Sequence, residues 1–371
     1  MTNLKVPFVD LKKINSVYKK KFLQSLNTAI KNSNFIKGKK TQLLEKKLCN
    51  VFKCKNALTL NSGTDALIVA IKSLNLKKGD EILTTSNTWI SSAYAIELNN
   101  CKPVFVDVNK NDFQMNVNLI ERKITKKTKA IIVTHLYGMP NDMDKIIQIS
   151  KKYSLFIIED IAQSHLAEYK KKITGNFGNI ACMSFYPSKN LGALGDGGAI
   201  LTNSKKYFLR CKSYANYGAV DFRNSDHKII GINSRLDEIQ AYFILEKLKY
   251  LKKETQKRLN LSKIYNQHCN KLGIKVISIN KNSKNVYHLY VIVIKNRNLV
   301  KKKLKENGIN CQIHYKIPIH LQTAFKHLNY KKGDLPVTEH LSKHILSIPF
   351  YPGIEKKKIS YLFSKLKKFI S

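Results

Sequence analysis

The chain has 371 residues, of which 43% are hydrophobic and 9% aromatic; these ordinary globular values exclude a disordered chain. The formal net charge of +41 suggests a nucleic-acid partner, but lysine rather than arginine supplies most of it, in short runs along predicted helix faces. We therefore expect a solvated basic surface and no nucleic-acid partner. Its field would affect only how fast an anionic substrate arrives.

Hydropathy and cysteine usage restrict the class further. No segment reaches eighteen apolar residues without a charge, so we expect a cytoplasmic protein with no membrane partner. The seven cysteines are scattered without a CxxC pair, and the histidines are not arranged around them in a zinc-like spacing. We expect reduced, mostly buried thiols and no metal.

Short apolar strands alternate with helices through the first half of the chain. Residues 56–60 are predicted to form a strand, followed by a tight turn and a helix that begins near Asp65. The same pattern recurs, with strands at 81–86, 103–108, 129–138 and 155–160 and helices at 91–98 and 143–153. This alternation predicts an α/β layer over about residues 55–203 with a mixed or mostly parallel sheet.

The character of the sequence changes near residue 235. A long lysine-studded helix is predicted over 236–269, strands at 286–294 and around 308–315, and an amphipathic helix at 356–370. We therefore predict a large domain over 1–245, including the N-terminal segment, and a small α+β domain over 246–371.

The first motif that suggests chemistry is SGTDAL, residues 62–67. A glycine and a hydroxyl residue at a helix start leave free backbone N–H groups beside the positive end of the helix dipole, which together bind phosphate. Taken alone, the same residues could be an ordinary helix cap by Ser62 or Thr64.

The second motif is LFIIEDIAQSH, residues 155–165, in which a buried strand runs into Glu159 and Asp160. Ligands of α/β sheets bind at the carboxyl ends of strands, and a buried carboxylate there needs a partner. Asp160 is a candidate to hold the protonated nitrogen of a cofactor ring. The alternative is an acid that caps the next helix.

The third motif, residues 183–200, places Lys189 between aromatic and hydroxyl residues and the glycines 192, 195, 197 and 198. Such glycine density allows the backbone to approach a ligand closely. A lysine that attacks an aldehyde needs a lowered pKa, which an apolar, loop-rich setting provides.

With these motifs in this order, the sequence resembles the DegT/DnrJ/EryC1/StrS family of sugar aminotransferases, within the aspartate aminotransferase superfamily of fold type I. The resemblance spans nearly the whole chain and includes FVDLKKI, TSNTWISSAYAI, GINSRLDEIQ and HYKIPIHLQ. It implies a three-layer αβα fold with a mixed, mostly parallel central sheet, plus a smaller α+β C-terminal domain.

The resemblance also implies roles for individual residues. Lys189 would be the catalytic residue, which forms the Schiff base with pyridoxal 5'-phosphate and shuttles the proton in both half reactions. Asp160 would pair with the pyridine nitrogen, Gln163 would approach the phenolic oxygen, and Trp89 would stack on the ring. The phosphate cradle would comprise Gly63, Thr64, Asp65 and Ser184, together with Asn233 given across the interface of a homodimer.

L-Glutamate and a nucleotide-linked keto sugar are the substrates that the resemblance implies. The sequence of the Lys189 motif most resembles that of members which aminate the C3 keto group of dTDP-linked 6-deoxy sugars. In those members the positions of Tyr186, His314 and Tyr315 would lie near the sugar. These three side chains could instead simply pack or hold structural hydrogen bonds. Amination at C4 also stays open, since members of both kinds share the cofactor motifs.

Two other functions remain as alternatives to this one. A sugar dehydratase of the same family would have a histidine in place of Lys189, and a non-enzymatic basic binding protein would not require Lys189, Asp160 and Trp89. One departure from the family pattern is Leu166, where many members have glycine, and it leaves the local backbone open.

Overall fold

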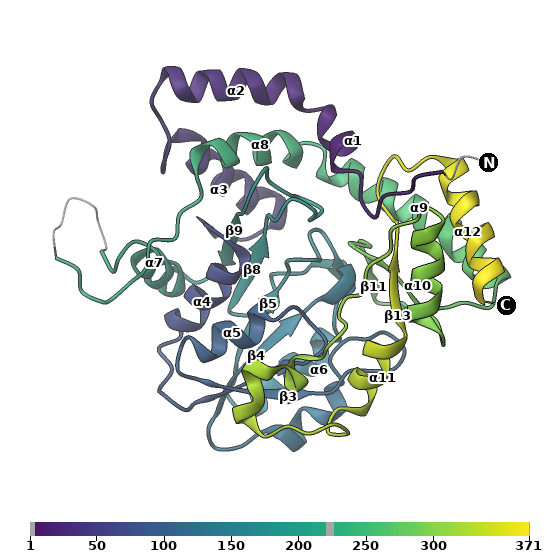
Figure 1. Ribbon diagram of the computed structural model, residues 1–371. Coiled ribbons are helices and arrows are strands. Elements are labelled where there is room, and N and C mark those ends of the chain that lie inside the picture. The colour runs from purple at the N-terminus through teal and green to yellow at the C-terminus, as the bar shows by residue number, and fades with distance from the viewer. Residues whose placement is uncertain (1–3, 220–225, 371) are drawn as a thin grey trace.

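A computed structural model describes residues 4–219 and 226–370 and shows a large sheet between two layers of helices (Figure 1). The sheet has seven strands in the order β1-β9-β8-β5-β4-β2-β3. β9 pairs antiparallel with both of its neighbours, and the other pairs are parallel. The strands are β1 (Asn56–Leu60), β2 (Glu81–Thr85), β3 (Lys102–Val106), β4 (Thr128–Thr134), β5 (Phe156–Asp160), β8 (Ile180–Ser184) and β9 (Gly198–Thr202).

Each face of this sheet has its own helices and its own hydrophobic cluster. One face packs on α4 (Gly63–Ser73), α5 (Ser91–Glu97) and α7 (Lys205–Tyr214). The other face packs on α3 (Lys39–Phe52), α6 (Met143–Lys152) and α8 (Glu238–Leu248). Because apolar side chains cover both faces, the inner strands are nearly continuous apolar runs, and the predicted three-layer αβα architecture with a mostly parallel sheet is confirmed.

Most predicted strands and helices of this region match the structure, but two predictions are partly wrong. The strand predicted over 129–138 ends at Thr134, and Leu136–Gly138 form a 3-10 helix in which Tyr137 has a φ of 61°, outside the range of a strand. The long helix predicted over 236–269 is interrupted. The chain ends α8 at Leu248 and starts α9 (Leu251–Lys271) after a bend at Tyr250. Leu248 and Leu251 are both buried in one cluster, so the apolar pattern continues through the bend without a glycine or proline to mark it.

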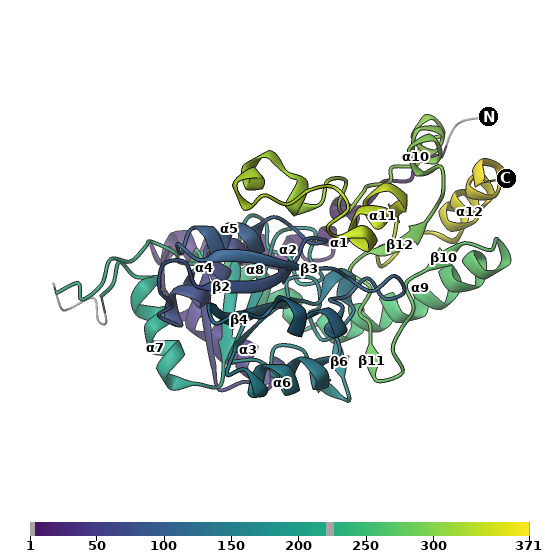
Figure 2. The same cartoon turned by 90° about the horizontal axis from the view of Figure 1, so that it is seen from below.

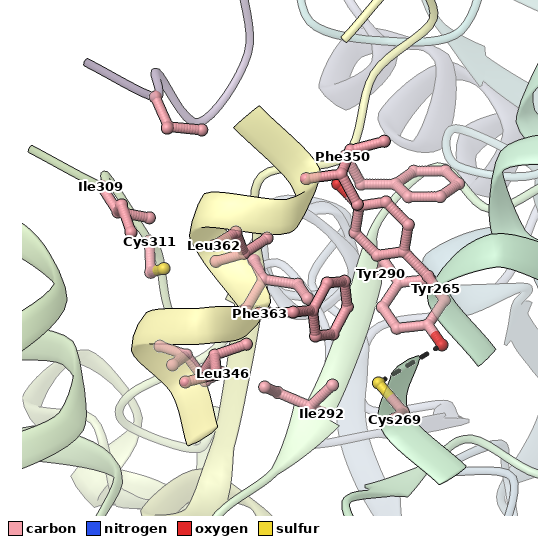
Figure 3. Close-up of a cluster of buried hydrophobic side chains, with 14 of the residues drawn as sticks. Tyr265, Cys269, Tyr290, Ile292, Ile309, Cys311, Leu346, Phe350, Leu362 and Phe363 are labelled. Atoms are coloured by element: carbon pink, nitrogen blue, oxygen red, sulfur yellow. Dashed lines mark hydrogen bonds between the residues drawn. The ribbon is translucent and has the colours of Figure 1, made fainter. Parts of the chain in front are cut away.

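The C-terminal part forms a second, smaller unit of structure around a three-stranded antiparallel sheet, β10 (Lys275–Val276), β12 (Tyr290–Val293) and β13 (Ile345–Ile348). Figure 3 shows its core beside α12 (Lys356–Ile370), where the ring of Tyr265 packs edge-on against Phe350 and Phe363 at 5.1 and 5.2 Å. Helices α10 (Arg297–Glu306) and α11 (Pro336–His344) complete it.

Two strands predicted for this part differ in the structure: the strand predicted over 286–294 spans only Tyr290–Val293, and residues 308–315 form isolated bridges instead of a strand. Ile309 forms a single bridge with Val6 and Gln312 one with Ser347, so this stretch links the N-terminal segment to the C-terminal core. The N-terminal segment continues into helices α1 (Leu11–Ser16) and α2 (Lys19–Lys31). A separate small sheet consists of β6 (Glu168–Tyr169), β7 (Lys172–Ile173) and β11 (Ser283–Lys284). The domain boundary after residue 245 stays a prediction.

Within the residues described, helices long and apolar enough to cross a membrane are absent.

Candidate active site

The candidate site lies where the parallel strands end. Asp160 is the last residue of β5 and Ser184 the last of β8, while Gly63 starts α4 just after β1. Parallel strands place their carboxyl ends at one edge of a sheet, which is where α/β sheets bind ligands. The tertiary structure thus brings all three sequence motifs to the same edge.

The SGT turn is both a helix cap and an open anion site. Ser62 Oγ accepts a hydrogen bond from the N–H of Asp65 at 3.0 Å, so the cap expected as the alternative does form. The first turn of a helix leaves further N–H groups without intrahelical partners, here those of Gly63 and Thr64. A Cβ added at Gly63 would lie 2.7 Å from Ser184 Cβ, so only glycine allows this turn to approach β8.

The carboxylate of Asp65 contacts the segment of residues 231–235 (GINSR). It accepts a hydrogen bond from Ser234 Oγ at 2.6 Å, and Ser234 also receives the N–H of Asn61 at 3.2 Å. Asn233, the neighbour of Ser234, is exposed and pairs through its backbone with Asn216. These contacts bring the GINSR segment next to the SGT turn of the same chain.

Lys189 lies in a tight loop after β8. Its N–H donates to the carbonyl of Tyr186 at 2.8 Å, and a Cβ at Gly192 would lie 2.3 Å from the carbonyl oxygen of Pro187, which shows how closely the loop folds on itself. Burial lowers the pKa of the Lys189 amino group to about 8, and the nearby carboxylate of Asp160 opposes that shift. An amine with a pKa of about 8 is roughly one-tenth neutral at pH 7, a far larger neutral fraction than that of an ordinary lysine, and this fraction can act as a nucleophile and proton carrier.

Asp160 is almost completely buried. Its carboxylate accepts hydrogen bonds from the N–H of Ala162 at 3.0 Å and from Thr134 Oγ1 at 3.5 Å. Burial raises its pKa, whereas the Ala162 N–H and the charge of Lys189 lower it. A buried carboxylate whose pKa is raised is stabilised by a cationic N–H partner, as a protonated ring nitrogen would be.

A chain of hydrogen bonds connects Gln163 to the C-terminal part. Gln163 Nε2 donates to the Tyr315 hydroxyl at 3.2 Å, and Gln163 Oε1 accepts from the N–H of Tyr137 at 2.8 Å. The Tyr137 hydroxyl in turn donates to the carbonyl of His314. His314 and Tyr315 therefore reach the site across more than 150 residues of sequence, as the resemblance implies for them.

Two aromatic side chains of the site stand open to solvent. Trp89 is 58% exposed, and its ring centroid lies 5.6 Å from that of Tyr315. Tyr186 is 54% exposed. The flat apolar ring of Trp89, exposed beside Tyr315, is a surface on which a planar ligand stacks.

His314 is the other side chain expected to contact the substrate, and its ring already has a partner. Its Nδ1 lies 2.8 Å from Ser347 Oγ. Burial, with a smaller contribution from the charge of Lys189, lowers the pKa of His314 to about 4. The imidazole is therefore neutral at pH 7, when it can donate or accept a hydrogen bond but adds no charge.

The structure settles the backbone at Leu166. Its φ of 66° lies in the left-handed region that glycine favours, so the chain keeps the conformation of a glycine despite the leucine. The side chain is 6% exposed and packs in the cluster beneath β8.

Sequence reasoning placed Glu159 at the end of a buried strand but missed its partner, His135. The Glu159 carboxylate lies 3.1 Å from His135 Nε2 and accepts the N–H groups of Phe177 and Gly178, each at 2.7 Å. Hydrogen bonds of this kind lower the pKa of Glu159 although burial raises it. The signal in the sequence was HLYG at the end of a strand, the segment that also carries Tyr137.

These residues fit pyridoxal phosphate. The open N–H groups at the start of α4 suit a phosphate, and the buried Asp160 carboxylate suits a protonated ring nitrogen. The exposed Trp89 ring suits the face of the cofactor, and Lys189 has the lowered pKa that attack on an aldehyde needs. Fold and site together define an aminotransferase-like enzyme of fold type I.

Comparison with known proteins makes the assignment specific. Residues 17–367 match the model of the DegT/DnrJ/EryC1/StrS aminotransferase family, and the chain belongs to that family. It is 36% identical over 364 residues, 98% of this chain and 99% of the relative, to a dTDP-3-amino-3,6-dideoxy-alpha-D-galactopyranose transaminase of Aneurinibacillus thermoaerophilus. A UDP-N-acetyl-3-dehydro-alpha-D-glucosamine 3-aminotransferase of Acidithiobacillus ferrooxidans is 33% identical, over 99% of this chain and 98% of the relative.

The fold has close counterparts among solved structures. A crystal structure of S. venezuelae DesV in complex with a ketimine intermediate has a TM-score of 0.95 and 30% identity, with 99% of each chain covered. The expected family, fold class and pyridoxal phosphate cofactor are thereby confirmed. The roles of individual site residues stay predictions.

Proposed function

We propose that the enzyme transfers an amino group from L-glutamate to the C3 keto group of a nucleotide-linked 6-deoxy sugar, with dTDP as the expected nucleotide. The observation that carries the chemistry is Lys189, whose burial lowers its pKa to about 8 beside the Asp160 carboxylate. Both relatives described above are named for an amino or keto group at C3 but differ in nucleotide, so they support the position more strongly than the nucleotide.

Pyridoxal phosphate, when bound, supplies an aldehyde that accepts the amino group and a ring that withdraws electrons from the reacting carbon. The N–H groups of Gly63 and Thr64, with the Ser184 hydroxyl, would hold its phosphate. Asp160 would hold its ring nitrogen, and Trp89 its face.

The chain's own residues then divide the remaining tasks. Neutral Lys189 Nζ takes a proton at one step and returns it at another, which a pKa of about 8 permits near neutral pH. Gln163 Nε2 donates to the Tyr315 hydroxyl at 3.2 Å, and it would also donate to the phenolic oxygen of the cofactor. Tyr186, His314 and Tyr315 would contact the sugar.

We also propose a homodimer in which Asn233 of one protomer completes the phosphate site of the other. Apolar side chains near Asn233 are exposed in the single chain, with Ile229 at 45% and Ile230 at 94%, as suits a surface that a second copy covers. An inactive Asn233→Ala protein mixed with an inactive Lys189→Ala protein should regain part of the activity. No recovery after confirmed subunit exchange contradicts sharing.

The reaction is tested in reverse with 2-oxoglutarate and a panel of nucleotide-linked amino sugars. Consumption of 3-amino sugars with release of glutamate supports the proposal, whereas turnover of only 4-amino sugars selects the C4 alternative. Loss of water from the sugar without amino transfer would indicate the dehydratase. Absence of visible absorbance after addition of pyridoxal phosphate, together with salt-dependent DNA binding, would revive the basic binding protein.

The cytoplasm is the compartment that we propose. Seven free cysteines suit a reducing environment.

A further inference from the structure

Three side chains from distant parts of the chain form a buried chain of hydrogen bonds beside the site. Ser86 Oγ lies 2.7 Å from His320 Nδ1, and His320 Nε2 lies 3.2 Å from Glu339 Oε1. The N–H of His320 donates to Ser86 Oγ at 2.9 Å, and the N–H of Ile319 donates to the Ser86 carbonyl at 3.1 Å. Ser86 follows β2, whereas His320 and Glu339 belong to the C-terminal part.

A Ser-His-Glu set resembles a hydrolytic triad, but its burial excludes that role. Ser86 is 1% exposed and His320 2%, so neither oxygen nor ring can meet a substrate. The serine hydroxyl also accepts the N–H of His320, which holds it as a structural group. Burial lowers the pKa of His320, and Glu339 opposes that shift.

These hydrogen bonds hold a segment of the C-terminal part against the first half of the chain. The segment of residues 315–335, seen over α5 and β3 in Figures 1 and 2, returns to the first half of the chain at His320. A second contact is the N–H of Phe105 donating to the Tyr330 hydroxyl at 3.0 Å, and the ring of Phe105 lies 6.4 Å from that of His320. Glu339, in α11, also accepts the N–H of Gly333 at 2.8 Å and so holds the C-terminal end of the segment.

Ser86 and His320 are each close in the sequence to an aromatic residue of the site. Trp89 follows Ser86 by three residues, and Tyr315 precedes His320 by five. The rings of Trp89 and Tyr315 lie 5.6 Å apart, so the position of one ring against the other depends on how the two segments are joined.

We propose that His320 is a positioning residue: bonded to Ser86 and Glu339, it holds the segment of residues 315–335 against the end of β2 and so fixes Tyr315 over Trp89. Its importance for turnover rests on the proposed function, but its effect on Trp89 does not. Since Tyr315 is expected to contact the sugar, the sugar half reaction should depend on His320 more than the glutamate half reaction does.

Trp89 is the only tryptophan in the chain, so its fluorescence reports this position without any substrate or cofactor. In His320→Ala, we expect acrylamide to quench Trp89 more strongly and the emission to shift to longer wavelength, because Tyr315 no longer holds its place. His320→Gln, whose amide can accept from Ser86 and donate to Glu339, should restore part of the wild-type signal.

In the complete enzyme, His320→Ala should raise KM for the keto sugar roughly tenfold to a hundredfold, as a displacement of about 1 Å does. The glutamate half reaction should slow less than the sugar half reaction, because Tyr315 is expected to reach the cofactor only through Gln163. His327→Ala is the matched control, because His327 lies in the same segment, is exposed and pairs with Glu97 at 2.9 Å.

Unchanged quenching in His320→Ala overturns the proposal, as does an equal loss in both half reactions. Should that variant not fold, Ser86→Ala decides, since it removes only one hydroxyl, and unchanged Trp89 quenching there has the same meaning. If wild-type protein shows no amino transfer at all, the proposed function fails, while the fluorescence still tests the role of His320.

Discussion

Replacing Lys189 with methionine should make the protein without cofactor more stable and catalytically inactive. Burial lowers the pKa of Lys189 from 10.5 to about 8, so at pH 7 the folded protein bears a charge that its surroundings disfavour. Each pKa unit corresponds to about 1.4 kcal/mol, which gives an upper limit of roughly 3 kcal/mol for the gain on removing the charge.

The net gain should be smaller. The charge of Lys189 lowers the pKa of Asp160, so its removal makes the buried carboxylate harder to ionise. We expect a net gain of about 1–2 kcal/mol at pH 7, which corresponds to a rise of a few degrees in Tm.

The pH dependence identifies the cause of this gain. Between the folded pKa of about 8 and the unfolded value of 10.5, the unfolded wild-type chain binds more protons, so its stability rises with pH. The advantage of Lys189→Met is therefore complete below pH 8 and disappears by about pH 10.5. Urea denaturation of both proteins without cofactor, at a series of pH values, measures it.

Lys302→Met, at an exposed position of α10, is the matched control and should change stability little. A loss of stability in Lys189→Met at pH 7, or a gain that persists unchanged above pH 11, would refute the argument from burial of the charge.

Three further predictions concern single residues. Gly63→Ala places a Cβ 2.7 Å from Ser184 Cβ, so it should lower the free energy of unfolding by about 1–3 kcal/mol and weaken the binding of pyridoxal phosphate, which calorimetry measures. Gly195→Ala is the control, because its Cβ would meet only the end of a glutamine side chain, and it should change both quantities little. Asp160→Asn should weaken the same binding roughly tenfold to a hundredfold, since it removes a charge-assisted hydrogen bond, and undiminished affinity would contradict its pairing with the ring nitrogen. Lys53→Gly should raise the stability measured by thermal denaturation by about 1 kcal/mol, because Lys53 follows α3 at a φ of 59°, in the left-handed region that favours glycine. Lys271→Gly, at the helical end of α9, should lower it. A loss of stability in Lys53→Gly would contradict the argument from backbone strain.

The local parts of the site could be predicted from the sequence because each depends on neighbours in the chain. The turn of Ser62 and Gly63, the acid at the end of the Phe156–Asp160 strand and the glycine-rich loop after Lys189 all form where the pattern indicates. Parallel strand order then brings these ends to one edge of the sheet. Apolar runs covered on both faces were sufficient to predict the layers.

Features that depend on contacts between distant segments could not be predicted in this way. The break between α8 and α9 has no glycine or proline to signal it. Residues 308–315 form only single bridges, and the partners, Val6 and Ser347, lie in segments that are far apart in the sequence.

The sequence by itself thus determined the fold class and the family and predicted the residues of the cofactor chemistry, since periodicity and short motifs are local properties. Only the tertiary structure decided how Tyr137, Gln163 and Tyr315 connect, how far Lys189 is buried, and that His320 meets Ser86. Hydrogen-bond partners and burial depend on which surfaces finally pack together, and no spacing along the chain records that.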